Sequence, residues 1–157
     1  MKWLASLLKQ IFGVSGQERP SPSDIVQKTG IIADDYAQKV IIDLHQLNIP
    51  FSKPVKVWVP PIPDTNSMDG AFDIGNNNIL IAGADEWEHF KLFDFLKVGD
   101  IAVYEVEAGR PVIHRIIEIG QDAGGAYYRF KGDNNTTSDA ARVRGNQIKW
   151  LSIGVVY

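Results

Sequence analysis

The sequence contains no cysteine, and this absence excludes disulfide bonds, thiolate nucleophiles and zinc sites built on thiolates. Its three histidines, His45, His89 and His114, lie in separate segments without the short spacing of metal ligands. We therefore expect no metal site and no cofactor. Basic residues are not in excess either, since the formal net charge at pH 7 is −3. Because nucleic-acid binding relies on basic patches that neutralise phosphates, we expect no nucleic-acid partner.

Long hydrophobic runs are missing as well, because no stretch approaches the roughly 18 apolar residues that span a bilayer. The nearest candidate is residues 1–14, where apolar side chains recur at helical spacing: Trp3, Leu4, Leu7, Leu8, Ile11 and Phe12. Lys9 interrupts this segment and no small-residue cleavage site follows it, which argues against a signal peptide. Two interpretations remain: the helix packs on the domain or on a partner chain, or it lies in a membrane interface. We therefore expect a chain that is soluble or attached to a membrane only peripherally, through residues 1–14.

The 157 residues are enough for one domain with an appendage, and 45% of them are hydrophobic, as a buried core requires. Residues 15–23 are polar and contain a glycine and two prolines, which is typical of a linker. Residues 33–47 then carry apolar side chains at three- and four-residue steps, with Asp34 and Asp35 near the start, which predicts a helix. We divide the chain into an N-terminal helical appendage, residues 1–50, and a β domain, residues 51–157.

The β domain is dominated by short apolar or alternating runs separated by turn residues, a pattern typical of strands. The predicted strands cover residues 55–59, 78–82, 101–106, 111–119, 126–131 and 147–157. One short helix is predicted over residues 85–96, with His89 at its surface and an apolar side formed by Trp87, Phe90, Phe93 and Leu96. These elements predict a mainly β (α+β) fold: a folded-over antiparallel β domain with N-terminal helices.

A serine lies at the centre of the polar loop Asp64-Thr65-Asn66-Ser67-Met68-Asp69-Gly70, between two predicted strands. A serine hydroxyl becomes a good nucleophile only when a base takes its proton. His114 is the prominent candidate for that base, and it lies in the middle of an apolar predicted strand. A carboxylate must then hold the imidazole, and the loop after the next strand offers two, Asp133 and Asp139. Each of these residues also has a structural interpretation: His114 as part of the sheet interior, and the aspartates as turn formers.

Four blocks of the sequence resemble the type I signal peptidase family: Ser67-Met68, Gly99-Asp100-Ile101-Ala102-Val103-Tyr104, Ile113-His114-Arg115-Ile116-Ile117, and Lys131-Gly132-Asp133-Asn134-Asn135 with Asp139. Their order and spacing look like the archaeal and endoplasmic-reticulum branch, which uses histidine where most bacterial enzymes use lysine. The resemblance runs from about residue 60 to the end of the sequence. The implied fold is shared with self-cleaving repressors of the LexA type. The short motif around Ser67, Pro63-Asp64-Thr65-Asn66-Ser67-Met68-Asp69, also resembles peptidase-like proteins of phages and integrated elements.

The resemblance implies a catalytic role for four residues. Ser67 would be the nucleophile, His114 the general base and later the general acid, and Asp139 the third member of the triad. Asp133 would be a supporting carboxylate that fixes its loop or assists the histidine. Either aspartate could be the one that contacts His114, so the choice between them stays open.

The resemblance also implies how a substrate would be held. The backbone N–H of Ser67 and the hydroxyl of Thr65 would form an oxyanion hole, and Met68 would line the substrate-binding region. Substrates of the family are extended peptides that add to a strand edge and carry small side chains at the cleavage site. The sequence departs from the family in having Gly70 where Ser-Met-x-Pro is usual, in the additional segment 76–98 and in lacking a transmembrane anchor.

The sequence therefore predicts a serine endopeptidase with a peptide or protein substrate. That substrate would be a signal-peptide-like segment, a partner protein or the chain's own linker at residues 15–23. The alternative is a non-catalytic regulatory or assembly module that reuses the same fold, because a fold does not fix a function. Geometry separates the two: a peptidase needs Ser67 near His114, with an aspartate on the other ring nitrogen.

Overall fold

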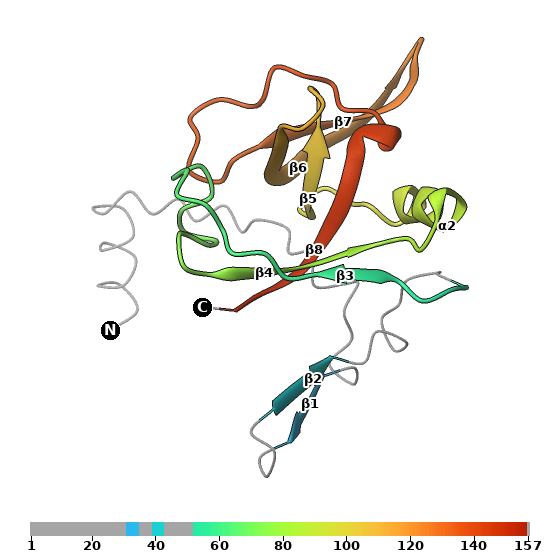
Figure 1. The fold of residues 1–157 in the computed structure, drawn as a ribbon. Helices are drawn as coiled ribbons and strands as arrows, with labels where there is room; N and C mark the ends of the chain where they lie inside the picture. The colour runs from blue at the N-terminus through green and yellow to red at the C-terminus, as the bar shows by residue number, and fades with distance from the viewer. Residues whose placement is uncertain (1–30, 35–38, 43–51, 157) are drawn as a thin grey trace, which may run out of the picture.

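The computed structural model describes residues 31–34, 39–42 and 52–156, which form two antiparallel sheets (Figure 1). The larger sheet has six strands in the order β3-β4-β8-β5-β6-β7, and every neighbouring pair is antiparallel. Its strands are β3 (Lys56–Trp58), β4 (Asn77–Ala82), β5 (Ile101–Glu105), β6 (Pro111–Asp122), β7 (Gly125–Lys131) and β8 (Ile148–Val156). The helical elements among the described residues are α2 (Glu86–Lys91), η4 (Leu92–Asp94) and η5 (Gly145–Gln147). The predicted mainly β, antiparallel fold is confirmed.

The helix predicted over residues 33–47 is wrong in its first part. Strands β1 (Ile31–Asp34) and β2 (Lys39–Ile42) pair there as a separate two-stranded sheet, with Asp34 opposite Lys39. Isoleucine and valine dominate both strands, and their branched β-carbons favour extended backbone. Asp34, expected near the start of a helix, is instead the last residue of β1. The predicted helix at residues 1–14, the linker 15–23 and His45 lie outside the described residues, so the division at residue 50 stays a prediction.

The predicted helix at residues 85–96 is present, but it exposes a different side from the one expected. Asp85 caps its start by accepting a hydrogen bond from the Glu88 N–H at 2.9 Å. The fully buried side chain of the first turn is Glu88, which accepts hydrogen bonds from the Ser52 N–H at 3.0 Å and from Lys91 Nζ at 3.1 Å. Trp87 is 72% exposed. A carboxylate with several donors is therefore buried in preference to an indole.

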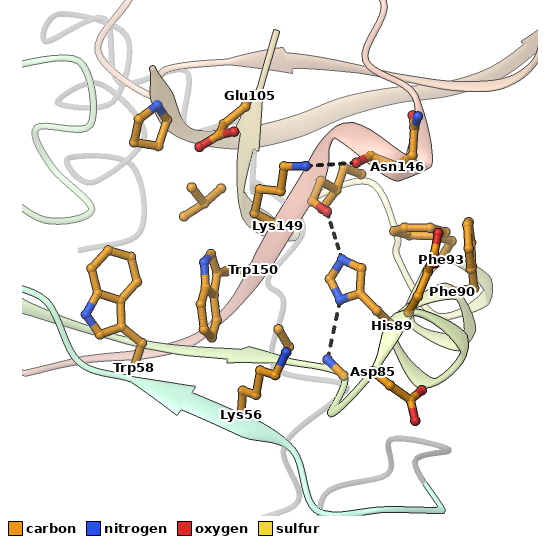
Figure 2. A pocket seen from close by; sticks show the side chains of 16 residues that line it. Lys56, Trp58, Asp85, His89, Phe90, Phe93, Glu105, Asn146, Lys149 and Trp150 are labelled. Atoms are coloured by element: carbon orange, nitrogen blue, oxygen red, sulfur yellow. Dashed lines mark hydrogen bonds between the residues drawn. The ribbon is translucent and has the colours of Figure 1, made fainter. Parts of the chain in front are cut away.

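The sequence predicted His89 at the surface of that helix, but the residue is half-buried and joins the helix to the sheet (Figure 2). Its Nε2 is 2.8 Å from the carbonyl oxygen of Ile148, and the Gly83 N–H donates to its Nδ1 at 3.4 Å. A backbone carbonyl only accepts, so the Nε2 atom carries the proton. His89 lines an open cavity of about 570 Å³, together with Trp58 and Trp150, whose rings lie 5.6 Å apart. The histidine therefore has a structural role between α2 and β8.

The core lies between strands β4 to β8 on one side and, on the other, η4 and the loop of residues 132–144 that follows β7. One cluster contains Ile81, Leu92, Leu96, Ala102, Tyr104, Ile116, Tyr128, Phe130, Val143, Ile148 and Leu151. Within it the ring of Tyr104 stacks on that of Phe130, with centroids 4.4 Å apart. We call the loop of residues 64–70, which contains Ser67, the serine loop. A second cluster packs this loop and its flanking residues against β5, through Ile62, Met68, Phe72 and Ile101. No helix in the described part of the chain is long and apolar enough to cross a bilayer.

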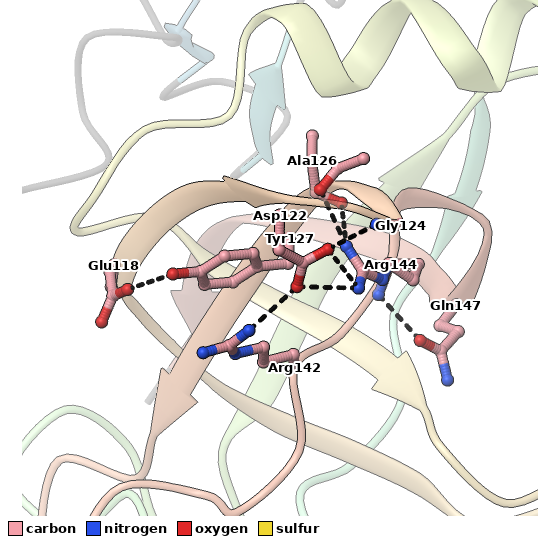
Figure 3. A network of polar contacts seen from close by, with 9 residues as sticks. Glu118, Asp122, Gly124, Ala126, Tyr127, Arg142, Arg144 and Gln147 are labelled. Carbon is pink, nitrogen blue, oxygen red and sulfur yellow. Dashed lines mark hydrogen bonds and ion pairs between the residues drawn. The ribbon is translucent and has the colours of Figure 1, made fainter.

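A polar network fixes the return of residues 132–144 onto the β6–β7 hairpin (Figure 3). Asp122, at the end of β6, accepts hydrogen bonds from Arg142 at 2.9 Å and from Arg144 at 2.8 Å. The guanidinium of Arg142 also lies 4.7 Å from the centre of the Tyr127 ring. Between the two arginines, Val143 exchanges backbone hydrogen bonds with Tyr128 of β7. The loop that carries Asp133 and Asp139 is therefore tied to β7 at its far end.

Replacing Phe130 with alanine should test how far the sheet depends on its larger core. The side chain is fully buried, so we expect Phe130→Ala to lower the free energy of unfolding by about 3–5 kcal/mol. Phe90 is a matched control, because its ring is partly exposed on α2 and packs edge to face on Phe93. Its replacement should cost about 1 kcal/mol. Urea unfolding followed by fluorescence measures both values, and equal losses would contradict the packing described.

Candidate active site

His114 lies near the start of β6, directly opposite Ala102 of β5. Only 7% of the residue is exposed, and its Nδ1 atom lies 2.7 Å from Oδ2 of Asp139. An ionised carboxylate can only accept, so the Nδ1 atom carries the proton. The Nε2 atom then has the lone pair, as a general base requires.

Asp139 is held in place from two strands. Its backbone N–H donates to the carbonyl oxygen of Phe130 in β7 at 2.9 Å, which fixes the main chain. The hydroxyl of Tyr104, in β5, donates to Oδ2 at 2.7 Å, which fixes the side chain. Burial, and then the hydrogen bond to Asp139, raise the pKa of Tyr104, so its hydroxyl remains a donor. The same carboxylate oxygen thus accepts from both Tyr104 and His114.

Asp133, the other candidate carboxylate, pairs with Arg115 through two parallel hydrogen bonds. The Nε atom of Arg115 donates to Oδ1 at 2.9 Å and its Nη2 donates to Oδ2 at 2.6 Å. The remaining arm of the guanidinium, Nη1, donates to the carbonyl oxygen of Gly99 at 2.6 Å. Both side chains of this pair are largely buried. Of the two aspartates, then, Asp139 contacts His114, while Asp133 joins the start of its loop to β6 and to the turn before β5.

The serine loop has a backbone that few other residue types could adopt. Asn66 has a φ of 55°, a left-handed conformation that asparagine tolerates better than most residues. Gly70 has a φ of 92°, which proline cannot reach because its ring fixes φ near −65°. Between them the Met68 carbonyl accepts hydrogen bonds from the N–H groups of Ala71 and Phe72. A proline therefore could not replace Gly70 in this turn.

The serine loop is docked on residues 132–134. The N–H of Asn134 donates to the Ser67 carbonyl oxygen at 3.0 Å, and its side-chain amide donates to the Asn66 carbonyl at 2.9 Å. The N–H of Asp133 lies 3.4 Å from the sulfur of Met68. Gly132 is close enough that an added β-carbon would lie 2.5 Å from the Ser67 carbonyl oxygen. One loop therefore contacts the serine at its start and the histidine, through Asp139, at its end.

The side chain of Ser67 contacts Thr65, with 3.2 Å between the two hydroxyl oxygens. No hydrogen bond joins Ser67 Oγ to His114 among the described residues. Of the two geometric conditions for a triad, the structure meets the one on the aspartate, and the approach of Ser67 to His114 stays a prediction. Met68 is 3% exposed and packs under the loop against Ile101. Its contact with a substrate stays a prediction.

Two residues of this site could not be singled out from the sequence. Tyr104 stands at an apolar position of a predicted strand, so it resembles an ordinary core residue. Arg115 follows His114 directly, and strand alternation sends the two side chains to opposite faces. Arginine can bind a carboxylate through two parallel hydrogen bonds, and this property could have pointed to Arg115. Its use requires knowing that the loop brings Asp133 beside Arg115, which the sequence does not tell.

The cavity beside α2 is separate from this site. Val103 and Trp150, paired across β5 and β8, line it, whereas Ala102 and His114 lie on the other face of the sheet. None of the predicted catalytic residues lines this cavity.

No protein-family model matches the chain. Two curated proteins are similar to part of it. The signal peptidase complex catalytic subunit sec11 of Dictyostelium discoideum is 40% identical over 58 residues, which are 36% of this chain and 32% of that protein. The signal peptidase complex catalytic subunit SEC11 of Eremothecium gossypii is 37% identical over 79 residues, 49% of this chain and 42% of that protein. The chain thus matches less than half the length of either relative. The predicted resemblance to signal peptidases is confirmed at this coarse level, while those to LexA-type repressors and phage proteins stay predictions.

Gly132 offers a test of how the serine loop is docked. In Gly132→Ala the new methyl group would collide with the Ser67 carbonyl, so we expect a loss of about 1–3 kcal/mol and a displaced loop. Gly154→Ala is the matched control, because its β-carbon would meet only Ile79, at an ordinary 3.6 Å. Thermal unfolding and the amide NMR shifts of Ser67 and Asn134 measure both effects. Unchanged shifts in Gly132→Ala would show that the contact is not as described.

Proposed function

We propose that this chain is a serine endopeptidase of the signal peptidase type, which cleaves an extended peptide. The observation that carries the proposal is the hydrogen bond from His114 Nδ1 to Asp139, which leaves the Nε2 atom of a nearly buried histidine as a base. The partial similarity to two signal peptidase catalytic subunits supports the same reaction class. Ser67 is the nucleophile, since its loop is docked on the segment that leads to Asp139.

In the proposed mechanism Ser67 Oγ attacks the carbonyl carbon of the scissile peptide bond while His114 Nε2 takes its proton. Asp139 stabilises the imidazolium that forms. The imidazolium then gives the proton to the leaving amine, and an acyl-enzyme remains on Ser67. Water attacks the ester with His114 again as base, which releases the second product and restores the serine.

The first step requires Ser67 Oγ to come within reach of His114 Nε2. Hydrogen bonds between catalytic groups are often long before substrate binds and shorten in the complex. Ser67 Oγ lies 3.2 Å from Thr65 Oγ1, and the mechanism requires a rotation about its χ1 angle that breaks this contact and turns the oxygen toward the histidine. We expect a bound peptide to favour that rotamer.

The charge that develops on the carbonyl oxygen needs donors in place before the reaction. We assign this role to the backbone N–H of Ser67, with the hydroxyl of Thr65 as second donor. Once Ser67 Oγ has turned away, the Thr65 hydroxyl is released from its contact with the serine. Asp133 supports the site without touching the reacting atoms, because its pairing with Arg115 holds the loop that docks the serine.

The substrate is expected to be an extended peptide with small side chains around the scissile bond. A signal-peptide-like segment fits the names of the similar proteins. A partner protein, or the chain's own linker at residues 15–23, would present the same kind of backbone. Residues 1–14 would bring the enzyme to a membrane surface if they bind there as an amphipathic helix.

The second candidate is a regulatory or assembly module that binds a protein without cleaving it. One observation favours it: Ser67 Oγ makes its hydrogen bond with Thr65 rather than with His114. In that case the His114–Asp139 pair would only complete a buried polar network in the sheet.

Serine and histidine replacements separate the two candidates. We expect Ser67→Ala and His114→Ala each to lower kcat by on the order of 10⁶-fold, because the triad acts as a unit. Digestion of a peptide library, read by mass spectrometry, measures the loss. His89→Gln is the matched histidine control and should cleave like the wild type, since its ring lies on the other face of the sheet. Full activity in His114→Ala would refute the mechanism, and no cleavage by the wild type would favour the module.

The two aspartates should differ in what they control. Asp139→Asn replaces the carboxylate that accepts the Nδ1 proton with a neutral amide, whose NH2 group can hold the wrong imidazole tautomer, so we expect kcat to fall by about 10⁴-fold with the fold intact. Asp133→Asn leaves Arg115 buried without its counter-charge, and should cost about 3 kcal/mol of stability. The folded fraction of Asp133→Asn should keep kcat within about tenfold. Paired kinetics and urea unfolding check both, and the opposite assignment of effects would falsify the division of roles.

A further inference from the structure

We propose that Tyr104 is a positioning residue that acts on His114 through Asp139 and lowers the proton affinity of the imidazole. The inference rests on the proposed function, because it concerns the base of the same reaction. Oδ2 of Asp139 accepts from His114 Nδ1 at 2.7 Å and from the Tyr104 hydroxyl at 2.7 Å.

Packing alone does not explain a tyrosine at this position. The residue is 3% exposed and its ring stacks on Phe130, so a phenylalanine would fill the same space. A buried hydroxyl costs free energy unless it finds a partner, and this one donates to a carboxylate. Because burial keeps the phenol protonated, the donor is permanent over the pH range in which histidine titrates.

Two donors on one oxygen compete. A carboxylate that accepts a second hydrogen bond has its negative charge better stabilised, and it attracts an imidazolium less. The Tyr104 hydroxyl therefore makes protonation of His114 less favourable. The histidine then stays neutral, and able to take the Ser67 proton, at lower pH than it otherwise would.

The other charges near His114 do not depend on Tyr104. On β6 the neighbouring Arg115 is paired with Asp133, and Lys131 of β7 lies opposite Arg115, on the other face from the histidine. The serine loop carries Asp69. Replacing Tyr104 with phenylalanine leaves all of these charges in place, so a change in the titration of His114 would report the lost hydroxyl.

The test compares Tyr104→Phe with Tyr128→Phe in the full chain. Tyr128 is equally buried in the same core, but its hydroxyl donates to the Phe93 carbonyl at 3.3 Å. We expect Tyr104→Phe to raise the midpoint of the His114 titration, followed by NMR of the ring proton on Cε1, by about 0.5–1 pH unit. The pH midpoint of the acidic limb in the profile of kcat/KM against pH should rise by the same amount. Tyr128→Phe should leave both midpoints unchanged.

Two further proteins complete the design. In the Asp139→Asn background, Tyr104→Phe should no longer shift the midpoint, because the connecting carboxylate is gone. Wild-type chain with 3-fluorotyrosine at position 104 has a more acidic hydroxyl, so it should lower the midpoint, and it keeps the ring in the core should Tyr104→Phe fail to fold.

The NMR titration needs no activity, so the two proposals can fail separately. An upward shift in a chain that cleaves nothing would support the coupling and refute the peptidase. An unchanged or lowered midpoint in folded Tyr104→Phe would overturn the role of Tyr104, even if Ser67 and His114 prove essential. A raised midpoint with 3-fluorotyrosine would overturn it as well.

Discussion

The hydrogen bond between His114 and Asp139 depends on the pairing of β6 with β7. That pairing places Arg115 opposite Lys131, so β7 ends level with the residue that follows the histidine, and the loop begins there. The loop that follows first meets the serine turn, and then returns to β7 where the Asp139 N–H binds the Phe130 carbonyl. A change of register between β6 and β7 would therefore move His114, Asp139 and the serine loop relative to one another.

Polar groups are buried around this site because each one satisfies another. Asp133 receives two donors from Arg115, whose third arm binds the Gly99 carbonyl. Asp139 receives His114 and Tyr104. Such groups are costly when any member is missing, and rigid when all are present. The sheet therefore supplies precise orientation for a histidine and a carboxylate, while the serine side chain remains outside the network, bound to Thr65.

The strands of the β domain could be predicted because alternating or β-branched runs lie between clear turn residues, as at Asp122 to Gly125. The pairing of β1 with β2 could not be predicted, because their isoleucines and valines also fall at helical steps and Asp34 suits either structure. Likewise, two aspartates six residues apart in one loop are equivalent in sequence. Arg115 decides between them by capturing Asp133, and that capture depends on where the loop runs in space. The role of Tyr104 is hidden for the same reason.

The carboxylate of Glu88 determines how a force applied to the chain at Ser52 would be transmitted to the domain. Ser52 is bound to it through both its N–H and its hydroxyl, and Lys53 pairs with Asp85 at the same helix. Helix α2 is in turn joined to β8 through His89 and the Ile148 carbonyl. A force that pulls on the chain at Ser52 would therefore load α2 and the β4–β8 half of the sheet. Strands β6 and β7, with the histidine and its aspartate, lie beyond β5, and that tension would reach them through the shared core and through the hydrogen bond from Tyr128 to the Phe93 carbonyl.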